Sequence, residues 1–430
     1  MRPRASPSAS MAQVEITAMT FGPFGVGRLD GKAVMVRGAA PGDLLEVTVI
    51  QERAGYLVAR AERVVEAGAA RRTPPCPYLP RCGGCDWQQI AYSDQVRFKG
   101  EVIKAALNRA LGRALDPASL IEPAPAEFGY RARLRFKAGR GGRLGFYEAG
   151  SRRLVEVERC MVAAAEIRVP REFAAAVECE EIEVVADRGR EVLVAHLARP
   201  PGAAVLARAR RLVERDARIA GAVLRAGRAR QVIGEASIAV ALEPGLELEV
   251  DADLFSQVNR AQNLKLVAAV MEMAGAAAGA RVLDLFCGAG NFSLPAARRG
   301  AEVMGVDAAA LVVAAAARNA ARLGFKRAEF AAMEAAELAR FLSRAHYRPG
   351  VVIMDPPRSG ARELIEPLLR MRAARVIYVS CDAATLARDL HALCAGGYQI
   401  AALRALDFFP NTHHAEIVAH AVLTSAATRS

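Results

Sequence analysis

From residue 251 onward, short apolar runs alternate with segments of helical periodicity. The runs lie near 281–286, 302–306, 327–330, 350–354, 375–380 and 398–403, and a last one spans 417–423. Apolar runs of this length, bounded by turns, are typical of buried strands. Their alternation with helices predicts a doubly wound α/β sheet, whose ligands bind at the carboxyl ends of the strands.

The first of these runs, Val282 to Phe286, breaks into a turn of small residues, Cys287 to Asn291, and apolar residues then resume in helical spacing. Glycines let the backbone approach a ligand closely, and a helix N-terminus offers free N–H groups. Asp307 closes the next strand, where a carboxylate holds a ribose hydroxyl roughly 20 residues after such a turn. The turn lacks the GxGxxG pattern, so a dinucleotide is not favoured. A glycine-rich turn of another α/β enzyme is the alternative.

The first half of the chain has a different pattern. Residues 11–69 hold short strand-like runs separated by Gly and Pro-Gly turns, which predict a small β-barrel of the oligonucleotide-binding kind; a barrel without a ligand is the alternative. Residues 93–112 have the spacing of an amphipathic helix, and 121–250 are rich in predicted strands. The basic, Ser- and Pro-rich residues 1–10 predict a disordered tail, with Met11 as an alternative start.

Four cysteines suggest a metal group. Cys76, Cys82 and Cys85 have the spacing C-x5-C-x2-C, and Cys160 follows much later. Structural zinc sites usually use two close pairs, whereas an iron–sulfur cluster takes four thiolates, so the pattern favours a cluster. Zinc and unliganded cysteines are the alternatives. The chain has eight cysteines, and it shows neither a signal-peptide pattern nor an apolar run of membrane-spanning length. These features predict a protein of the reducing cytoplasm.

The formal net charge of +12 is spread along the chain, which favours an extended polyanion as partner. In the segment 130–137, strict alternation places cations on one face of a strand. Four such cations repel one another, so a phosphate backbone is the expected partner, with a solvated edge strand as the alternative. The predicted RNA-binding residues are Arg131, Arg133, Arg135 and Lys137.

Three more motifs lie at predicted strand ends: the DPPR turn from Asp355 to Arg358, the pair Cys381-Asp382, and the segment from Asp407 to Glu416. Amino-group methyltransferases also have a DPP turn but follow it with an aromatic residue. Cys381 lies between a strand and a helix N-terminus, where the helix dipole is expected to lower the pKa of the thiol. A buried, inert cysteine is the alternative.

DLFCGAGNFSL resembles the first motif of S-adenosylmethionine-dependent methyltransferases, in which Asp284 or its neighbours face the methionine part. Together with DPPR, VSCDAATLARDL and FFPNTHHAE, it makes the chain similar to the RNA uracil-C5 methyltransferase family. The cysteines match the family's iron–sulfur members, which act on bacterial 23S ribosomal RNA, and the barrel resembles a TRAM domain.

The resemblance implies that Cys381 is the nucleophile and Glu416 the base. It implies a 4Fe-4S cluster on the four cysteines, and S-adenosylmethionine at Gln257, Phe286, Asn291, Asp307, Glu334 and Asp355. One departure is that the family's usual SCNP reads Ser380-Cys381-Asp382-Ala383 here, and the missing proline is expected to loosen this loop.

The sequence thus predicts a cytoplasmic, monomeric enzyme that makes 5-methyluridine in 23S ribosomal RNA. Transfer RNA is the alternative substrate, and a non-catalytic RNA-binding or assembly protein is the alternative of another class. The expected parts are a tail (1–10), a TRAM-like barrel (11–69), a central iron–sulfur and RNA-binding domain (70–92 and 121–250), and a Rossmann-like methyltransferase domain (93–120 and 251–430).

Overall fold

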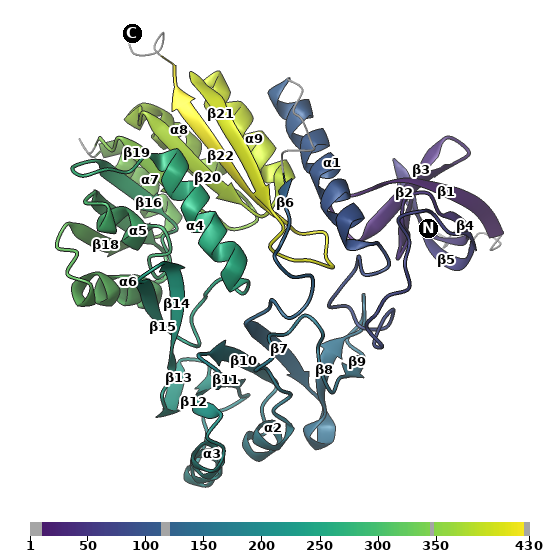
Figure 1. Ribbon diagram of the computed structural model, residues 1–430, viewed down its shortest axis with the longest axis horizontal. Coiled ribbons are helices and arrows are strands. Elements are labelled where there is room, and N and C mark those ends of the chain that lie inside the picture. Colours follow the sequence, from purple (N-terminus) through teal and green to yellow (C-terminus); the bar gives the residue numbers. More distant parts are fainter. Residues whose placement is uncertain (1–10, 113–120, 345–347, 425–430) are drawn as a thin grey trace, which may run out of the picture.

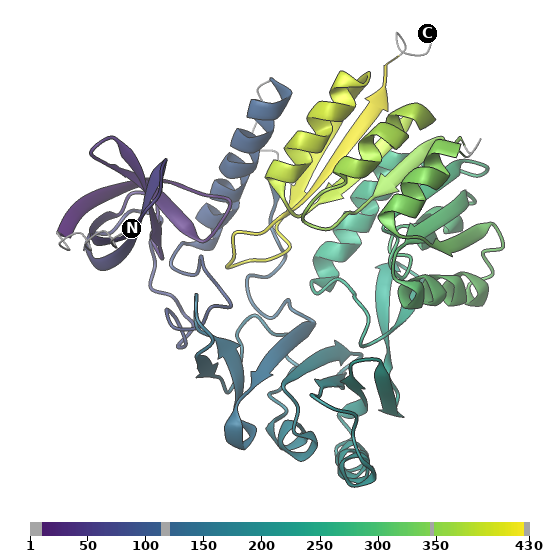
Figure 2. The ribbon, with the colours of Figure 1, turned by 180° about the vertical axis from the view of Figure 1, so that it is seen from behind.

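The computed structural model describes residues 11–112, 121–344 and 348–424 and has three parts (Figure 1). An N-terminal barrel and a large C-terminal α/β domain lie on either side of one long helix, and a β-sheet with two helices lies below them in the view of Figure 1. Figure 2 shows the same arrangement from behind. The tail predicted at 1–10 lies outside the described residues.

The N-terminal part is a closed barrel with the strand order β1-β2-β3-β5-β4. Its strands are β1 (Met11–Met19), β2 (Phe24–Leu29), β3 (Lys32–Arg37), β4 (Leu44–Glu52) and β5 (Tyr56–Glu66). Val34 and Val36 of β3 are fully buried and their neighbours are not, because successive side chains of a strand point to opposite faces. The predicted small barrel is confirmed.

The central part is a seven-stranded sheet with the order β13-β12-β11-β10-β7-β8-β9. Its strands are β7 (Arg133–Ala138), β8 (Leu144–Tyr147), β9 (Leu154–Glu156), β10 (Glu181–Asp187), β11 (Arg190–His196), β12 (Ile219–Ala226) and β13 (Ala229–Gly234). Helices α2 (Arg171–Val177) and α3 (Ala203–Arg215) cover one face and share a hydrophobic core with the sheet.

The C-terminal part is an eight-stranded sheet with the order β18-β17-β16-β19-β20-β22-β21-β6. Its strands are β6 (Ile121–Glu122), β16 (Arg281–Leu285), β17 (Glu302–Asp307), β18 (Ala328–Ala332), β19 (Val351–Met354), β20 (Arg375–Ser380), β21 (Tyr398–Leu406) and β22 (Glu416–Leu423). The strands from β18 to β20 are parallel, and β22 is antiparallel to both of its neighbours. The predicted doubly wound sheet is confirmed, with strand bounds that closely follow the apolar runs.

Helices cover both faces of this sheet. One face packs against α4 (Arg260–Ala274), α5 (Ser293–Arg298) and α6 (Ala310–Arg322), and the other against α1 (Tyr92–Leu111), α7 (Ala335–Arg344), α8 (Arg362–Met371) and α9 (Ala383–Ala395). Strand β6 extends the sheet beside β21, although residues 121–122 were predicted to belong to the central domain. None of the helices in the described part of the chain is both long and apolar enough to cross a lipid bilayer.

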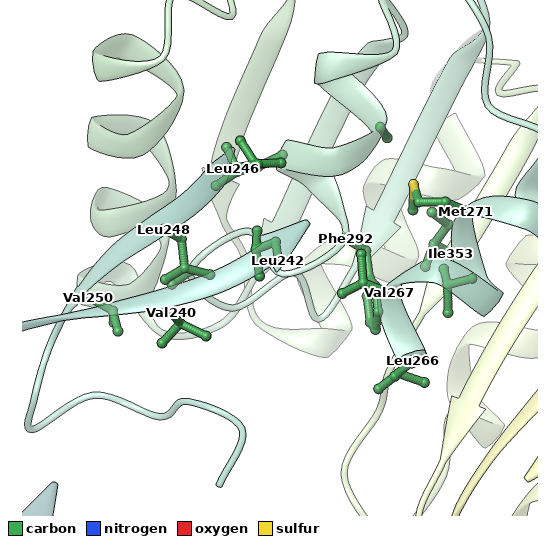
Figure 3. Packing of buried hydrophobic residues seen from close by; sticks show 14 of the residues in the cluster. Val240, Leu242, Leu246, Leu248, Val250, Leu266, Val267, Met271, Phe292 and Ile353 are labelled. Carbon is green, nitrogen blue, oxygen red and sulfur yellow. The ribbon is translucent and has the colours of Figure 1, made fainter. Parts of the chain in front are cut away.

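A hairpin of β14 (Ser237–Glu243) and β15 (Leu246–Asp251) forms a separate two-stranded sheet, and its buried residues share one hydrophobic cluster with residues of both the central sheet, such as Val185, and the C-terminal domain. Figure 3 shows hairpin residues such as Val240 and Leu248 in the same cluster as Leu266 and Val267 of α4. Sequence alone placed these residues in the central domain, because the local pattern of two strands does not show which sheet they join.

Candidate active site

A cavity of about 490 Å³ opens at the carboxyl ends of β16, β17 and β19. Its volume is within the range of small-molecule sites. Of the residues predicted to hold a cofactor, those that line it are Gln257, Phe286, Asn291, Asp307 and Asp355. Glu334 is exposed and is not among the lining residues. The exposed Phe255, which the sequence analysis did not single out, also lines this cavity.

The turn after β16 has an unusual backbone. Phe286 adopts a φ of 62°, a left-handed conformation that is rare for an aromatic residue and typical of functional sites. The N–H of Gly288 then donates to Oδ2 of Asp307 over 3.0 Å. Asn291 exchanges two amide hydrogen bonds of 2.9 and 3.1 Å with Asn263 of α4, a residue that sequence reasoning missed. These contacts hold the cavity wall in place before any ligand binds.

Asp284 lies behind this wall. It is fully buried, accepts a hydrogen bond from Ser293, and does not line the cavity. Burial, with smaller effects from Asp355 and Asp307, raises the pKa of Asp284 to about 7. Among the residues expected to face the methionine part of the cofactor, therefore, the neighbour Phe286 reaches the cavity and Asp284 supports it from behind.

The pairing of β20 with β22 brings the predicted nucleophile and base together. In this antiparallel pair Ser380 lies opposite Ile417. Cys381 follows Ser380 and Glu416 precedes Ile417, so Cys381 and Glu416 are neighbours. Glu416 is buried, and Cys381 is partly exposed. Asp355 follows β19, the parallel neighbour of β20, and lies at the same edge of the sheet. One sheet edge thus presents a thiol and two carboxyl groups.

The thiol does not have the lowered pKa that the helix dipole predicted. Burial, together with the negative charges of Glu416 and Asp355, raises the pKa of Cys381 to about 11, against the opposing effect of Arg358. The side chain of Asp382 caps α9 by accepting from the N–H groups of Ala384 and Thr385 over 3.0 and 2.9 Å. Because this carboxylate already occupies the positive end of the helix, little of the dipole is left for the thiol.

The loop that carries Cys381, which was expected to be loose, is held by hydrogen bonds of Asp382. Besides capping the helix, Asp382 exchanges backbone hydrogen bonds of 3.1 Å with the hydroxyl of Ser380, and Ala383 is fully buried. Ala383 stands where the usual motif has its proline, and the hydrogen bonds of Asp382 hold the segment that carries Cys381 to Ser380 on one side and to α9 on the other.

The two carboxyl groups favour their protonated forms when no ligand is present. Loss of surrounding water raises the pKa of Asp355 to about 7. Burial and the nearby charge of Asp355 raise the pKa of Glu416 well above its usual range. Two carboxylates so close to each other resist ionising together. A cation placed beside them would favour the charged forms of both.

The two histidines before Glu416 have different surroundings. Nδ1 of His413 lies 2.6 Å from Oδ2 of Asp86, and Nε2 of His414 lies 3.1 Å from Arg358. Burial, reinforced by His413 and Arg358, lowers the pKa of His414 to about 3. At neutral pH His414 is therefore uncharged and too weakly basic to be a good general base.

The four cysteines of the expected metal site come together. A second cavity of about 180 Å³ is lined by Cys76, Cys82, Cys85 and Cys160, and burial raises the pKa of Cys85 to about 12. The N–H of Gly84 donates to Sγ of Cys82 over 3.4 Å, whereas that of Gly83 donates to the carbonyl oxygen of Tyr147. Within the described residues, no group of His, Cys, Asp and Glu side chains is arranged to hold a metal ion.

The predicted basic strand is not a row of free cations. Glu183 of β10 accepts from Arg135 over 2.7 Å and lies 3.3 Å from Arg133, and Glu181 pairs with Lys137. These acids lie directly opposite the cations in the antiparallel register of β7 and β10. The argument from mutual repulsion therefore fails for these three side chains. Arg131 lies instead on the wall of the cysteine cavity.

Comparisons with known proteins find relatives over most of the chain. The family model described as tRNA (Uracil-5-)-methyltransferase matches residues 244–423. The 23S rRNA (uracil(1939)-C(5))-methyltransferase RlmD of Shewanella amazonensis is 33% identical over 423 residues, 91% of this chain and 91% of that protein. The protein of the same name from Pseudomonas putida is 32% identical and covers 96% of this chain and 94% of its own length.

A solved structure shares the architecture. The Pyrococcus abyssi tRNA (uracil-54, C5)-methyltransferase in complex with S-adenosyl-L-homocysteine has a TM-score of 0.74, covers 96% of this chain and 100% of its own, and is 24% identical. The chain therefore has a methyltransferase fold. It belongs to the RNA uracil-C5 methyltransferase family, whose members are S-adenosylmethionine-dependent enzymes, as the sequence motifs indicated.

Proposed function

We propose that this enzyme methylates C5 of a uridine in 23S ribosomal RNA, with S-adenosylmethionine in the 490 Å³ cavity and Cys381 and Glu416 as catalytic residues. The observation that carries the proposal is the register of β20 and β22, which makes this thiol and this carboxyl group neighbours at the edge where Asp355 meets the cavity. The choice of 23S RNA is supported by the names of the similar Shewanella and Pseudomonas proteins.

The proposed mechanism follows from the chemistry of uracil, whose C5 is a weak nucleophile. The Cys381 thiolate adds to C6, forming an S–C6 bond and shifting the C5–C6 electron pair into an enolate with carbanion character at C5. The bound cofactor supplies an electrophilic methyl group on a sulfonium. C5 takes this methyl group, the carboxylate of Glu416 removes the C5 proton, and the electron pair re-forms the C5–C6 double bond and expels the Cys381 thiolate.

The raised pKa values of Cys381 and Glu416 constrain this series of reaction steps. Cys381 must lose its proton before it attacks, and the guanidinium of Arg358 favours its thiolate. Glu416 must be ionised to act as a base, although burial and Asp355 disfavour the charge. A sulfonium bound beside Asp355 supplies the missing positive charge. The target base has to leave its stack to reach Cys381, which favours a loop over a regular duplex.

The base and the nucleophile can be tested separately by denaturing electrophoresis after incubation with RNA and cofactor. Glu416→Gln should transfer the methyl group yet accumulate a covalent protein–RNA adduct, because the C5 proton stays in place. Cys381→Ala should form none. Normal turnover by Glu416→Gln would remove Glu416 from the mechanism. Incubation of the native enzyme with 23S fragments and with transfer RNA decides the substrate, and methylation of transfer RNA alone would contradict the proposal.

We further propose that Cys76, Cys82, Cys85 and Cys160 hold a 4Fe-4S cluster. The four thiols line one cavity, and a cluster of this kind takes four thiolates. Anaerobic purification should give a brown protein with iron and sulfide, and Cys160→Ser should lose both. Stoichiometric zinc without iron would contradict the cluster.

A further inference from the structure

The loop between β21 and β22, Asp407 to Ala415, carries the chain from the edge of the sheet to Glu416. In Figures 1 and 2 it reaches away from the sheet, to the place where the barrel, the central part and α1 meet. For most of its length it has no regular secondary structure. The position of Glu416 therefore depends on what holds this loop.

Asn411 is the main anchor. It is fully buried with a φ of 68°, and its carbonyl oxygen accepts from the N–H groups of Asp86 and Trp87 over 3.1 and 3.0 Å. Its own N–H donates to Gln95 of α1 over 2.7 Å, and its side chain donates to the carbonyl of Glu127 over 3.1 Å. One residue thus ties the loop to three other segments of the chain.

The segment that follows Cys85 makes a second contact. Oδ2 of Asp86 lies 2.6 Å from Nδ1 of His413, and the ring of His413 lies 3.8 Å, centroid to centroid, from that of His414. Tyr130, which precedes Arg131 on the wall of the cysteine cavity, donates its hydroxyl proton to the carbonyl of Pro410 over 3.1 Å. Both contacts come from segments that carry residues of the cysteine cavity.

We propose that Asp86 and Asn411 are positioning residues for the base Glu416, and that they couple the filling of the cysteine cavity to removal of the C5 proton. Asp86 is adjacent to Cys85. A cysteine segment with a fixed conformation therefore also fixes the N–H groups of Asp86 and Trp87 and the carboxylate of Asp86, which hold the loop. An enzyme that loses its group from the cysteines would still attack uracil with Cys381, because β20 and α9 hold that residue independently.

This inference rests on the proposed role of Glu416 and predicts a selective defect. Displacement of a base by a fraction of an ångström slows proton removal, while cofactor binding in the separate cavity is unaffected. An enzyme in which this coupling is broken therefore forms the covalent adduct at its normal rate and resolves it slowly. A general loss of folding would instead lower adduct formation, cofactor affinity and iron content together.

The test uses the full-length, iron-loaded protein. Asp86→Ala should slow adduct resolution by about tenfold to hundredfold, with unchanged iron content and cofactor affinity. Asp86→Asn, whose amide oxygen still accepts from His413, should restore most of the rate. Asn411→Gly tolerates the positive φ and removes only the side-chain contacts, so it should show the same defect in a folded protein. The matched control is Asp94→Ala, because Asp94 pairs with Arg97 on α1 and does not contact the loop.

A second readout uses Trp87, the only tryptophan of the chain, which is buried and whose backbone N–H donates to Asn411. Removal of iron by a chelator should shift its emission maximum to longer wavelength and slow adduct resolution in parallel. Unchanged resolution in Asp86→Ala and Asn411→Gly, or an unchanged emission maximum after iron removal, would overturn the coupling. Absence of adduct in Glu416→Gln would instead overturn the proposed base, which keeps the two failures distinguishable.

Discussion

Cofactor binding should release protons, because the cavity holds a carboxyl group that is half protonated near neutral pH. Asp355 lines the cavity, and its pKa is raised to about 7 by loss of surrounding water. A sulfonium beside it favours the ionised form. If only that form binds tightly, the ionised fraction rises from about one tenth at pH 6 to about nine tenths at pH 8, and the affinity rises about tenfold.

The folding stability of the protein without cofactor depends on pH in the opposite direction to the cofactor affinity. A carboxyl group whose pKa is raised on folding contributes stability that is present below the unfolded pKa and is lost as the pH rises through the folded one. For Asp355 the rise from 3.8 to about 7 corresponds to a loss of about 4 kcal/mol between these pH values. The increase in melting temperature on adding S-adenosylmethionine should therefore be larger at pH 8 than at pH 6.

Calorimetric titration in buffers of different ionisation enthalpy measures the affinity and the protons released together. Asp355→Asn is the control and should bind weakly with little pH dependence. An affinity that is flat between pH 6 and 8, or a slope that persists in Asp355→Asn, would refute the reasoning.

Three further predictions concern side chains whose surroundings are known. Lys99 and Asp407 form a buried ion pair of 2.6 Å, so Lys99→Met should destabilise the protein by about 3–5 kcal/mol in denaturant unfolding, and a second change, Asp407→Leu, should restore most of this. Arg133→Ala should lower the melting temperature, whereas Arg135→Ala, at a half-exposed side chain, should mainly weaken RNA binding and its salt dependence in a filter assay. Asp382→Ala removes the cap of α9 and should cost about 1 kcal/mol and slow adduct formation; an unchanged rate would show that the cap does not matter for Cys381.

Much of the C-terminal domain could be predicted, because its strands and turns are encoded by contiguous residues. The apolar run that became β16 and the small-residue turn after it are contiguous, and Asp307 follows at the end of the next strand. The hairpin of β14 and β15, within the predicted central domain, forms a sheet of its own, because alternation shows that a strand has a buried face but does not show what covers that face. The exposed Glu334 was placed in the cavity by resemblance alone, and the cavity does not reach it.

The electrostatic predictions failed where a partner comes from a distant part of the chain. The cations of β7 have no acidic residue near them in sequence, yet Glu181 and Glu183 lie opposite them in the sheet. The helix dipole was expected to activate Cys381, but Asp382 occupies the helix end and the charge of Glu416 acts in the opposite direction. Charge effects depend on distance in space, which the order of residues does not contain.

By itself, the sequence determined the residue types of the site and the elements that carry them: a thiol at a strand end, a carboxylate after a loop, four cysteines and a glycine-rich turn. Only the tertiary structure decided that Ser380 pairs with Ile417, which makes Cys381 and Glu416 neighbours, and that Asn411 joins their loop to the segment after Cys85. Motifs are read from contiguous residues, whereas register and long-range hydrogen bonds depend on how separate segments pack against one another.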